Sequence, residues 1–532
     1  MTAPLIRNPV LPGFRPDPSI VYADGWYYLV TSTFEWYPGV PVHRSPDLVR
    51  WELVGHVLDR PGLLDLRGVP DSGGVWAPSL SWHGGRFQLA YSVVRTAGGP
   101  YKDIDNYLTT APDMLGPWSD PVHLNSSGID PALFHDEDGR TWLLNTRWDH
   151  RPDRPSFDGI LLQEYDPDKR SLIGEPVNIL RHDDGELIEG PNLYRHDGWY
   201  VLLLAEGGTG WNHGVRAARS RSLTGPYALD PAGPLLTTRD TCGGPLQKAG
   251  HGELVRTPGG EWYLAHLASR PLHTPEGPRC VLGRETCLQR VVWNGEGWPR
   301  LAHGTNRPRT EVRAPTGTAR GTAPVPGPVR DDFDAPRPDV AWSTLRGPAD
   351  ASWLSLSERP GWLRLRGRQS PASLFDQSLL ARPLRSTHCE AATVMDFRPS
   401  RFPQMAGLIC WYDTGTHYYL RATHSERHGG RVLGVCYADD GTYGELAESE
   451  LPVDDWPLLH LSARFDGPVL RFSASPDGRT WRPVGPELDA TRLSDDYGAA
   501  LRFTGAHVGL CVQDLDGGRA SADFDWFALG DH

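Results

Sequence analysis

The chain of 532 residues lacks any uninterrupted apolar run of about 18 residues, the length needed to cross a bilayer. Residues 1–9 also lack the apolar stretch of a secretion signal. The seven cysteines are an odd number without a Cys-X-X-Cys pair, so neither a disulfide framework nor a zinc ribbon is indicated. Cys280 and Cys287 could pair only in an oxidising compartment. These absences predict a cytoplasmic protein without a membrane partner.

Positive charge is also in short supply. Lys and Arg number 53 against 66 Asp and Glu, which gives a formal net charge of -13. A nucleic-acid backbone or an anionic membrane is not attracted to such a protein, so we expect a small neutral substrate. Aromatic residues, in contrast, are abundant, and 20 Trp and 18 Tyr suit both a β-rich core and platforms for sugar rings. The oligomeric state stays open, a homo-oligomer included.

One local pattern occurs five times in the first part of the chain. Each copy has a short apolar strand, a turn of the Asp-Gly or Gly-Gly type, and a strand rich in aromatic residues, which is the strongest local signal for a β-hairpin. The copies cover residues 19–29, 79–89, 132–143, 192–202 and 253–264. A spacing of about 55 to 60 residues suits four-stranded propeller blades with long loops. We therefore predict a five-bladed β-propeller over residues 1–304.

Acidic residues stand at matching places in these repeats. The first strand of each blade lines the channel of a propeller, so the residues just before those strands meet at one mouth of the channel. Those residues are Asp17, Trp76 with Ala77, Asp130, Glu189 and His251. Two carboxyl groups that flank a glycosidic bond can hydrolyse it, and a third carboxylate nearby raises the pKa of the proton donor. The pattern therefore predicts a site that cleaves glycosides.

The composition changes between residues 305 and 329, where Pro, Gly, Thr and Arg replace apolar periodicity. We interpret this segment as a linker. Short runs of alternating apolar and polar residues follow over residues 330–532 and predict an antiparallel β-sandwich of the concanavalin-like jelly-roll type. Residues 475–481 resemble a sialidase Asp-box, but a single copy outside the propeller is interpreted as a hairpin turn. The predicted fold class is thus all-β, with two domains.

Seven short segments carry a further signal. They include Arg15-Pro16-Asp17-Pro18, Phe34-Glu35-Trp36, Trp76-Ala77-Pro78, Ile129-Asp130-Pro131, Ile188-Glu189-Gly190-Pro191, Gly250-His251-Gly252 and Gly283-Arg284-Glu285-Thr286. Together these segments resemble glycoside hydrolase family 43, specifically its two-domain β-xylosidase branch. The resemblance runs over nearly the whole chain and is strongest in residues 8–300.

The resemblance implies an inverting hydrolase with Asp17 as general base and Glu189 as general acid. Asp130 would orient Glu189 and raise its pKa. Inversion requires a carboxyl separation of about 6.5 to 9.5 Å, so that water fits between base and sugar. Arg284 would bind sugar hydroxyls and keep carboxylates ionised, and His251 would orient groups beneath the site. No cofactor is required, and a calcium ion near His251 is left open.

The same resemblance implies the walls of the pocket. A pentose would pack against residues that match wall positions in the propeller, namely Phe34, Trp76, Ala77 and Thr209. Phe503 would reach from a sandwich loop into the mouth of the propeller. His507 stands nearby, where another aromatic side chain is expected, so the sequence departs from the family pattern there.

The predicted function is that of an exo-1,4-β-xylosidase, which removes D-xylose from the non-reducing end of short xylooligosaccharides. A sandwich loop that closes the cleft would admit only a chain end. An α-L-arabinofuranosidase, or an enzyme with both activities, is the nearest alternative because the two sugars present similar hydroxyl patterns. A non-catalytic sugar-binding propeller would not need three converging acids. A fructan-cleaving propeller would carry an Asn-Asp-Pro-Asn motif where Arg15-Pro16-Asp17-Pro18 stands.

Overall fold

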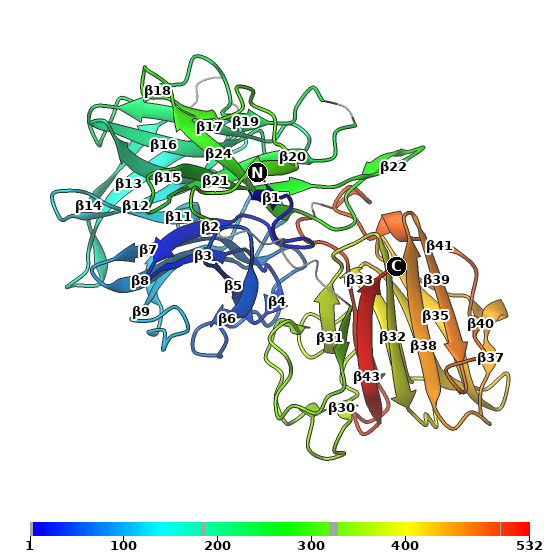
Figure 1. The fold of residues 1–532 in the computed structure, drawn as a ribbon. Helices are drawn as coiled ribbons and strands as arrows, with labels where there is room; N and C mark the ends of the chain where they lie inside the picture. The colour runs from blue at the N-terminus through cyan, green and yellow to red at the C-terminus, as the bar shows by residue number, and fades with distance from the viewer. Residues whose placement is uncertain (1–3, 182–186, 242, 319–327, 501) are drawn as a thin grey trace.

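The computed structural model describes residues 4–181, 187–241, 243–318, 328–500 and 502–532. It consists of β-strands and two short 3-10 helices, η1 (Ala447–Ser449) and η2 (Ala490–Arg492). Figure 1 shows two domains: the N-terminal part of the chain forms a ring of sheets, and the C-terminal part forms two sheets packed face to face. Within the described ranges, no helix is long and apolar enough to cross a membrane. The predicted all-β class is confirmed.

The ring contains five antiparallel sheets, one for each blade. Blade I comprises β2 (Ser19–Ala23), β3 (Trp26–Val30), β5 (Gly39–Ser45) and β6 (Glu52–Leu58), and blade II comprises β7 (Gly74–His83), β8 (Arg86–Val94), β9 (Ile104–Ala111) and β10 (Val122–Asn125). Blade III comprises β11 (Gly128–His135), β12 (Thr141–Trp148), β13 (Phe157–Asp166) and β14 (Ser171–Leu180). Blade IV comprises β15 (Ile188–His196), β16 (Trp199–Glu206), β17 (Gly214–Ser220), β18 (Ala228–Leu229) and the additional β19 (Leu236–Thr237). Blade V comprises β20 (Gln247–Arg256), β21 (Trp262–Ser269), β24 (Glu285–Trp293) and β25 (Pro299–Leu301), with the hairpin β22 (Leu272–Thr274) and β23 (Gly277–Arg279) inserted.

The predicted hairpins are the first two strands of the blades, and they share one register. Each hairpin pairs two aliphatic residues at the same position. The pairs are Ile20 with Leu29, Leu80 with Leu89, Leu133 with Leu143, Leu193 with Leu202 and Leu254 with Leu264. These side chains join apolar clusters that lie between successive blades, the last of which connects blade V to blade I. Burial of such residues at about 1.5–3 kcal/mol each holds the ring together.

The N-terminal segment ties the last blade to the first. β1 (Leu5–Arg7) pairs with β26 (Glu311–Arg313), and the Asn8 side chain donates to the carbonyl oxygen of Leu288 and accepts its N–H, both at 2.8 Å. β26 lies inside residues 305–329, so this part of the predicted linker belongs to the propeller. Its central residue, Val312, packs into the apolar cluster between blades V and I. The sequence analysis did not predict this strand because three residues are too few to show periodicity. Residues 319–327 of the predicted linker lie outside the described residues.

The second domain is an antiparallel β-sandwich with one continuous apolar core. In order across the first sheet lie β29 (Leu354–Ser355), β30 (Leu363–Arg366), β43 (Ser521–Asp531), β32 (His388–Asp396), β38 (Leu459–Asp466), β39 (Val469–Ser475) and β40 (Arg482–Pro483), with β27 (Val329–Asp331) on β43 and β41 (Leu488–Asp489) on β39. Across the second lie β36 (Thr442–Glu445), β35 (Gly430–Asp439), β34 (Thr416–Ser425), β33 (Gln404–Asp413), β42 (His507–Asp514), β31 (Ser378–Pro383), β28 (Ser343–Leu345) and β4 (Trp36–Tyr37), with β37 (Leu451–Pro452) on β35. The predicted sandwich is confirmed. Residues 475–481 form the β39–β40 turn, closed by backbone N–H groups that donate to Asp477.

A loop of blade I contributes a strand to the sandwich. β4 follows β3 in the sequence but pairs with β28, where Leu345 lies opposite Trp36. The next residue, Arg346, is 1% exposed and donates to the Val69 carbonyl at 2.6 Å and to the Asp71 carboxylate at 2.6 Å. Both acceptors belong to the propeller. Backbone pairing and a buried guanidinium therefore join the two domains into one unit.

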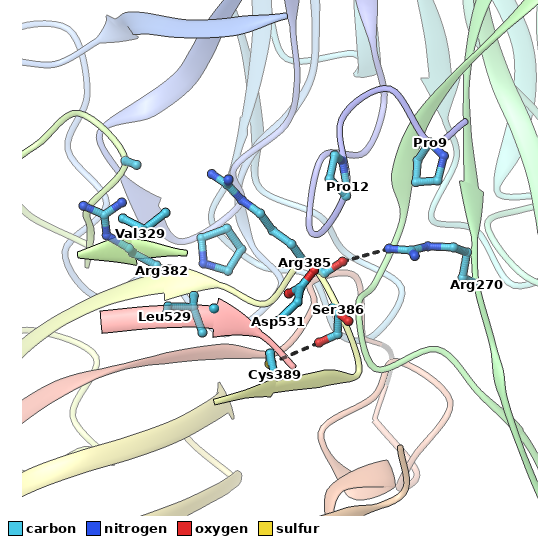
Figure 2. A pocket seen from close by; sticks show the side chains of 13 residues that line it. Pro9, Pro12, Arg270, Val329, Arg382, Arg385, Ser386, Cys389, Leu529 and Asp531 are labelled. Atoms are coloured by element: carbon cyan, nitrogen blue, oxygen red, sulfur yellow. Dashed lines mark hydrogen bonds between the residues drawn. The ribbon is translucent and has the colours of Figure 1, made fainter. Parts of the chain in front are cut away.

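A second junction surrounds a pocket of about 220 Å³ in the seam between the domains (Figure 2). Arg270 donates to both carboxylate oxygens of Glu285, at 2.7 and 2.8 Å, and to the carbonyl oxygen of Arg385 in the sandwich at 2.9 Å. Glu285 also accepts the Gly13 N–H at 2.7 Å. One buried carboxylate thus links blade V, the N-terminal segment and, through Arg270, the sandwich. Elsewhere in the interface, Cys280 is buried as a free thiol, as is Cys287 within blade V.

Replacing Arg346 by Met should lower the free energy of unfolding by about 2–3 kcal/mol, because Asp71 and the Val69 carbonyl lose a buried donor. Urea unfolding followed by tryptophan fluorescence measures the change. Arg330→Met is the matched control, since Arg330 pairs with Asp332 where both side chains are about half exposed, and it should change stability by less than about 0.5 kcal/mol. Equal effects of the two substitutions would contradict the role of Arg346.

Candidate active site

A pocket of about 230 Å³ lies at one end of the propeller axis. Every residue that the sequence analysis assigned to the site lines it: Asp17, Phe34, Trp76, Ala77, Asp130, Glu189, Thr209, His251, Arg284 and Phe503. All of them belong to the propeller except Phe503, which comes from the sandwich. The structure thus brings together side chains from all five blades and from the second domain.

Backbone irregularities aim the acids into this pocket. The innermost strands of blades II to V each contain a register shift at the same place, next to the pocket. Every blade has a left-handed residue at this shift or, in blade I, just before the first strand: Asp17 (φ 51°), Ala77 (φ 30°), Asp130 (φ 57°), Gly190 (φ 58°) and, in blade V, both Lys248 (φ 51°) and His251 (φ 43°). A bulge re-aims the side chain beside it, whereas a regular strand would alternate side chains between two faces. Left-handed non-glycine residues are strained, and such strain concentrates at functional sites.

Asp17 is held in its ionised form. The Asp17 side chain is 7% exposed. Its carboxylate accepts the Ser32 hydroxyl at 2.6 Å and the Arg284 guanidinium at 3.0 Å, and His251 Nδ1 lies 3.6 Å away. Burial alone raises the pKa of Asp17. The electrostatic effects of Arg284 and His251 and the hydrogen bond from Ser32 together outweigh burial and lower the pKa below its ordinary value. Asp17 is therefore a carboxylate at neutral pH.

Asp130 and Glu189 behave in the opposite way. Burial, followed by the charge of Glu189, raises the pKa of Asp130, and burial, followed by the charge of Asp17, raises the pKa of Glu189. The two groups titrate together, so the pair keeps a proton at higher pH than an isolated carboxyl group. Asp130 also accepts the N–H of Gly190 at 2.9 Å, which fixes the backbone next to Glu189. The pocket therefore contains one carboxylate and a pair of carboxyl groups that retains a proton.

Arg284 connects this chemistry to the second domain. Its side chain is 2% exposed, with Nη1 donating to Asp17 and Nη2 donating to the carbonyl oxygen of Phe503, both at 3.0 Å. The guanidinium also lies over the rings of Phe34 and Phe503, 5.5 and 5.7 Å from their centroids. One side chain thus fixes the charge of Asp17 and the position of the sandwich loop.

Three aromatic rings form a wall of the pocket. The Phe34 and Phe503 rings are stacked with centroids 5.8 Å apart, and the Trp76 ring meets Phe503 edge-on at 5.2 Å. His507, the departure from the family pattern, stacks on Trp36 at 3.9 Å. Burial lowers the pKa of His507 to about 3, so it packs as a neutral ring. An imidazole therefore fills the place of the expected aromatic side chain behind the wall.

The channel beneath His251 is the place where the sequence analysis left a calcium ion open. It is lined by Ser19, Asn192 and Glu253 below the catalytic pocket. Burial raises the pKa of Glu253 to about 8, and calcium takes about six to eight oxygen ligands, mostly carboxylates and carbonyls. The lining also includes Asp130, so oxygen-bearing side chains are present there, and a calcium ion near His251 stays a prediction.

A separate cluster in the interface contains side chains of the kinds that bind metals. Within the described residues, it is the one group of three such side chains whose ligand atoms lie close together, and it consists of Cys280, Asp495 and Asp496. Lys248 Nζ already contacts both carboxylates there, at 3.3 and 2.6 Å. An ammonium group therefore neutralises this cluster.

Among the pocket-lining residues that sequence reasoning missed, Lys102, Trp148 and Phe157 contact one another. The Lys102 ammonium lies 4.6 Å from the Trp148 ring centroid, and the Phe157 ring meets Trp148 edge-on at 5.3 Å. They belong to the loops and strand ends between the second and third strands of blades II and III. The blade topology could have indicated them. The connection between the second and third strands lies at the same end of a blade as the start of its first strand, where the acids lie.

A propeller whose axis ends in a pocket with one ionised carboxylate and a pair of carboxyl groups that retains a proton is the arrangement of a glycoside hydrolase. Comparison with known families agrees. Residues 6–299 match the model of glycosyl hydrolases family 43, and residues 330–529 match that of the beta xylosidase C-terminal concanavalin A-like domain. The chain therefore belongs to glycosyl hydrolases family 43, and the resemblance found in the sequence is confirmed.

Individual relatives extend over the full length of the chain. A xylosidase/arabinosidase 43B of Humicola insolens is 43% identical, covering 98% of this chain and 97% of its own. A beta-xylosidase of Bacillus subtilis is 42% identical, covering 98% and 99%. The crystal structure of a xylan beta-1,4-xylosidase from Bacillus halodurans superposes with a TM-score of 0.95 at 48% identity, covering 99% and 100%. The similarity therefore includes both domains and their arrangement.

Gly190→Ala should reduce the turnover of a chromogenic glycoside by more than about tenfold, because a Cβ there would lie 3.0 Å from His251 Nε2 and would displace the backbone beside Glu189. Gly25→Ala is the control, since Gly25 shares the left-handed backbone (φ +85°) but a Cβ at that position would meet no heavy atom within 4 Å. Backbone strain of about 1–2 kcal/mol should then appear in both thermal melts. Equal turnover by the two variants would show that the contact with His251 is unimportant.

Proposed function

We propose that the protein is an exo-acting, inverting 1,4-β-xylosidase that removes D-xylose from the non-reducing end of short xylooligosaccharides. The observation that carries the proposal is that the pKa of Asp17 is lowered and the pKa of Glu189 is raised inside one pocket that Phe503 also lines. An inverting glycosidase needs one carboxylate and one carboxylic acid on opposite sides of the scissile bond. The names of the full-length relatives support xylose as the sugar.

In the proposed mechanism, Asp17 accepts a proton from a water molecule that attacks the anomeric carbon. Glu189 donates its proton to the glycosidic oxygen as the bond to the leaving sugar breaks. Arg284 keeps Asp17 ionised, burial and the charge of Asp17 raise the pKa of Glu189, and Asp130 holds the adjacent backbone through the Gly190 N–H. Water supplies the hydroxyl group of the released xylose and the proton that regenerates Glu189, so the reaction balances without a redox cofactor.

The closed wall supports an exo mode of action. Phe503 is 9% exposed and stacks on Phe34, so an aromatic side chain blocks the pocket on the sandwich side. A chain end fits such a pocket, whereas an internal unit would have to continue through the wall. The exposed mouth near Trp148 and Lys102 is where the rest of a short oligosaccharide would leave the pocket.

Release of xylose from xylobiose tests the substrate, and hydrolysis of p-nitrophenyl β-D-xyloside followed by proton NMR tests the stereochemistry, because nitrophenol contributes no anomeric signal. The first product signal should be α-D-xylose, because inversion at a β-linked anomeric carbon gives the α anomer before mutarotation. Initial formation of the β anomer would contradict the inverting assignment. Absence of xylose with a properly folded enzyme would contradict the proposed substrate.

Asp17→Ala should lower kcat by at least about a thousandfold while xylose still binds, because the water loses its base. Calorimetry with xylose measures the binding that remains. Glu189→Ala should impair xylobiose hydrolysis more than p-nitrophenyl β-xyloside hydrolysis, since nitrophenolate leaves with little protonation. Unchanged turnover by Asp17→Ala would remove this residue from the mechanism.

Arg284→Met should shift both limbs of the pH profile of kcat/KM to higher pH. Arg284 lowers the pKa of Asp17 and also that of Glu189, so its loss raises both. Asp17 is active above its pKa and Glu189 below its own, so the acidic limb and the alkaline limb move in the same direction. An acidic limb at its wild-type position in the variant would show that Arg284 does not set the ionisation of Asp17.

An α-L-arabinofuranosidase activity is the second candidate, because the Humicola insolens relative carries both names. The ratio of kcat/KM for p-nitrophenyl β-xyloside and p-nitrophenyl α-L-arabinofuranoside separates the two. A small neutral substrate accords with the net charge of -13. The cytoplasmic location, the oligomeric state and a calcium requirement stay predictions.

A further inference from the structure

Ser72 lies in the turn before β7 and is 2% exposed, with a left-handed backbone (φ 60°). Its hydroxyl oxygen accepts the N–H of Phe503 at 3.0 Å, and its carbonyl oxygen accepts the indole N–H of Trp76 at 3.0 Å. One residue that no motif singles out therefore holds two of the three rings of the aromatic wall.

Glu35 holds Ser72 in turn. Its Oε2 accepts the Ser72 N–H at 3.0 Å, and the Glu35 side chain is fully buried. Glu35 directly follows Phe34, the third ring of the wall, whose backbone exchanges two 3.0 Å hydrogen bonds with Val75. The N–H, the carbonyl oxygen and the hydroxyl of Ser72 thus all form hydrogen bonds. These bonds join the segments that carry Phe34, Trp76 and Phe503.

The sandwich reinforces the same unit. The Arg346 N–H donates to the Glu35 carbonyl at 2.9 Å, and Asp71 accepts both the Arg346 guanidinium and the Thr414 N–H. Burial raises the pKa of Glu35 to about 8, so the group is neutral at pH 7 and an amide can replace it in shape and charge. This property supplies a conservative variant for a test.

We propose that Ser72, held by Glu35, is the positioning residue that sets the geometry of the aromatic wall and thereby the selectivity of the pocket for a xylopyranosyl over an arabinofuranosyl group. The inference rests on the proposed function. The flat face of a six-membered ring requires a wall of fixed shape, and a five-membered ring with an exocyclic carbon makes a different contact surface. Neither Ser72 nor Glu35 lines the pocket, so they act through Phe503, Trp76 and Phe34.

The test measures kcat and KM of four variants on p-nitrophenyl β-xyloside and α-L-arabinofuranoside. Ser72→Ala and Glu35→Ala should raise KM for the xyloside by about 5- to 20-fold with kcat within about threefold, and should lower the xyloside-to-arabinofuranoside ratio of kcat/KM by at least about fivefold. Glu35→Gln should restore wild-type values because it keeps the acceptor for the Ser72 N–H. Ser45→Ala, which removes a buried hydroxyl from blade I outside the pocket, should leave all values unchanged.

Wild-type KM and wild-type ratio in Ser72→Ala would overturn the inference, as would parallel loss of kcat on both substrates with no change of ratio. Thermal melts identify a variant that fails to fold. If Ser72→Ala does not fold, the comparison of Glu35→Gln with Glu35→Ala tests whether the acceptor for the Ser72 N–H sets the KM and the substrate ratio. The proposed function fails separately, if the wild-type enzyme cleaves no xyloside or releases the β anomer. The change of ratio between variants and wild type is still measurable with an enzyme that prefers the arabinofuranoside.

Discussion

The ion pair between Arg284 and Asp17 is the interaction on which the rest of the site depends. Both side chains are almost fully buried, at 2% and 7% exposure, and removing two charges from water is costly unless each is hydrogen-bonded. Asp17 meets this condition through Ser32, and Arg284 meets it through the carbonyl oxygen of Phe503. The pair therefore keeps an ionised carboxylate in an apolar pocket and at the same time requires the sandwich loop to be in place. The same Arg284 side chain therefore keeps Asp17 ionised and holds Phe503 at the pocket wall.

The backbone strain of the left-handed residues around the propeller axis is compatible with a stable fold, because other residues form the apolar interfaces between the blades. The left-handed residues and bulges occupy the pocket ends of the innermost strands, whereas the aliphatic pairs that fill the blade interfaces lie further along the same hairpins. Each strained residue costs about 1–3 kcal/mol, and the buried side chains of the interfaces offset this many times over. The repeated scaffold can therefore hold several acids at close range in orientations that a regular strand would not allow.

The second domain completes the active site rather than merely following it. β4 of blade I enters the sandwich sheet, and Phe503 of the sandwich enters the propeller mouth, so each domain contributes to the other. Ser72 and Arg284 hold the two sides of the Phe503 backbone, through its N–H and its carbonyl oxygen. A propeller alone would present an open cleft, and the sandwich converts it into a pocket for a chain end. The exo mode of the proposed reaction is thus a property of the domain interface.

Local sequence determined much of this protein, because hairpins, turns and the acids beside them are encoded by neighbouring residues. The repeat of strand, turn and aromatic strand was sufficient to predict the propeller, and the register of that repeat was sufficient to place Asp17, Asp130 and Glu189 at one mouth. The strand Glu311–Arg313, the mouth residues Lys102 and Trp148, and the network of Ser72 were decided only by the tertiary structure. Their roles depend on partners hundreds of residues away or on which end of a blade a loop occupies, and no periodicity of the chain records such contacts.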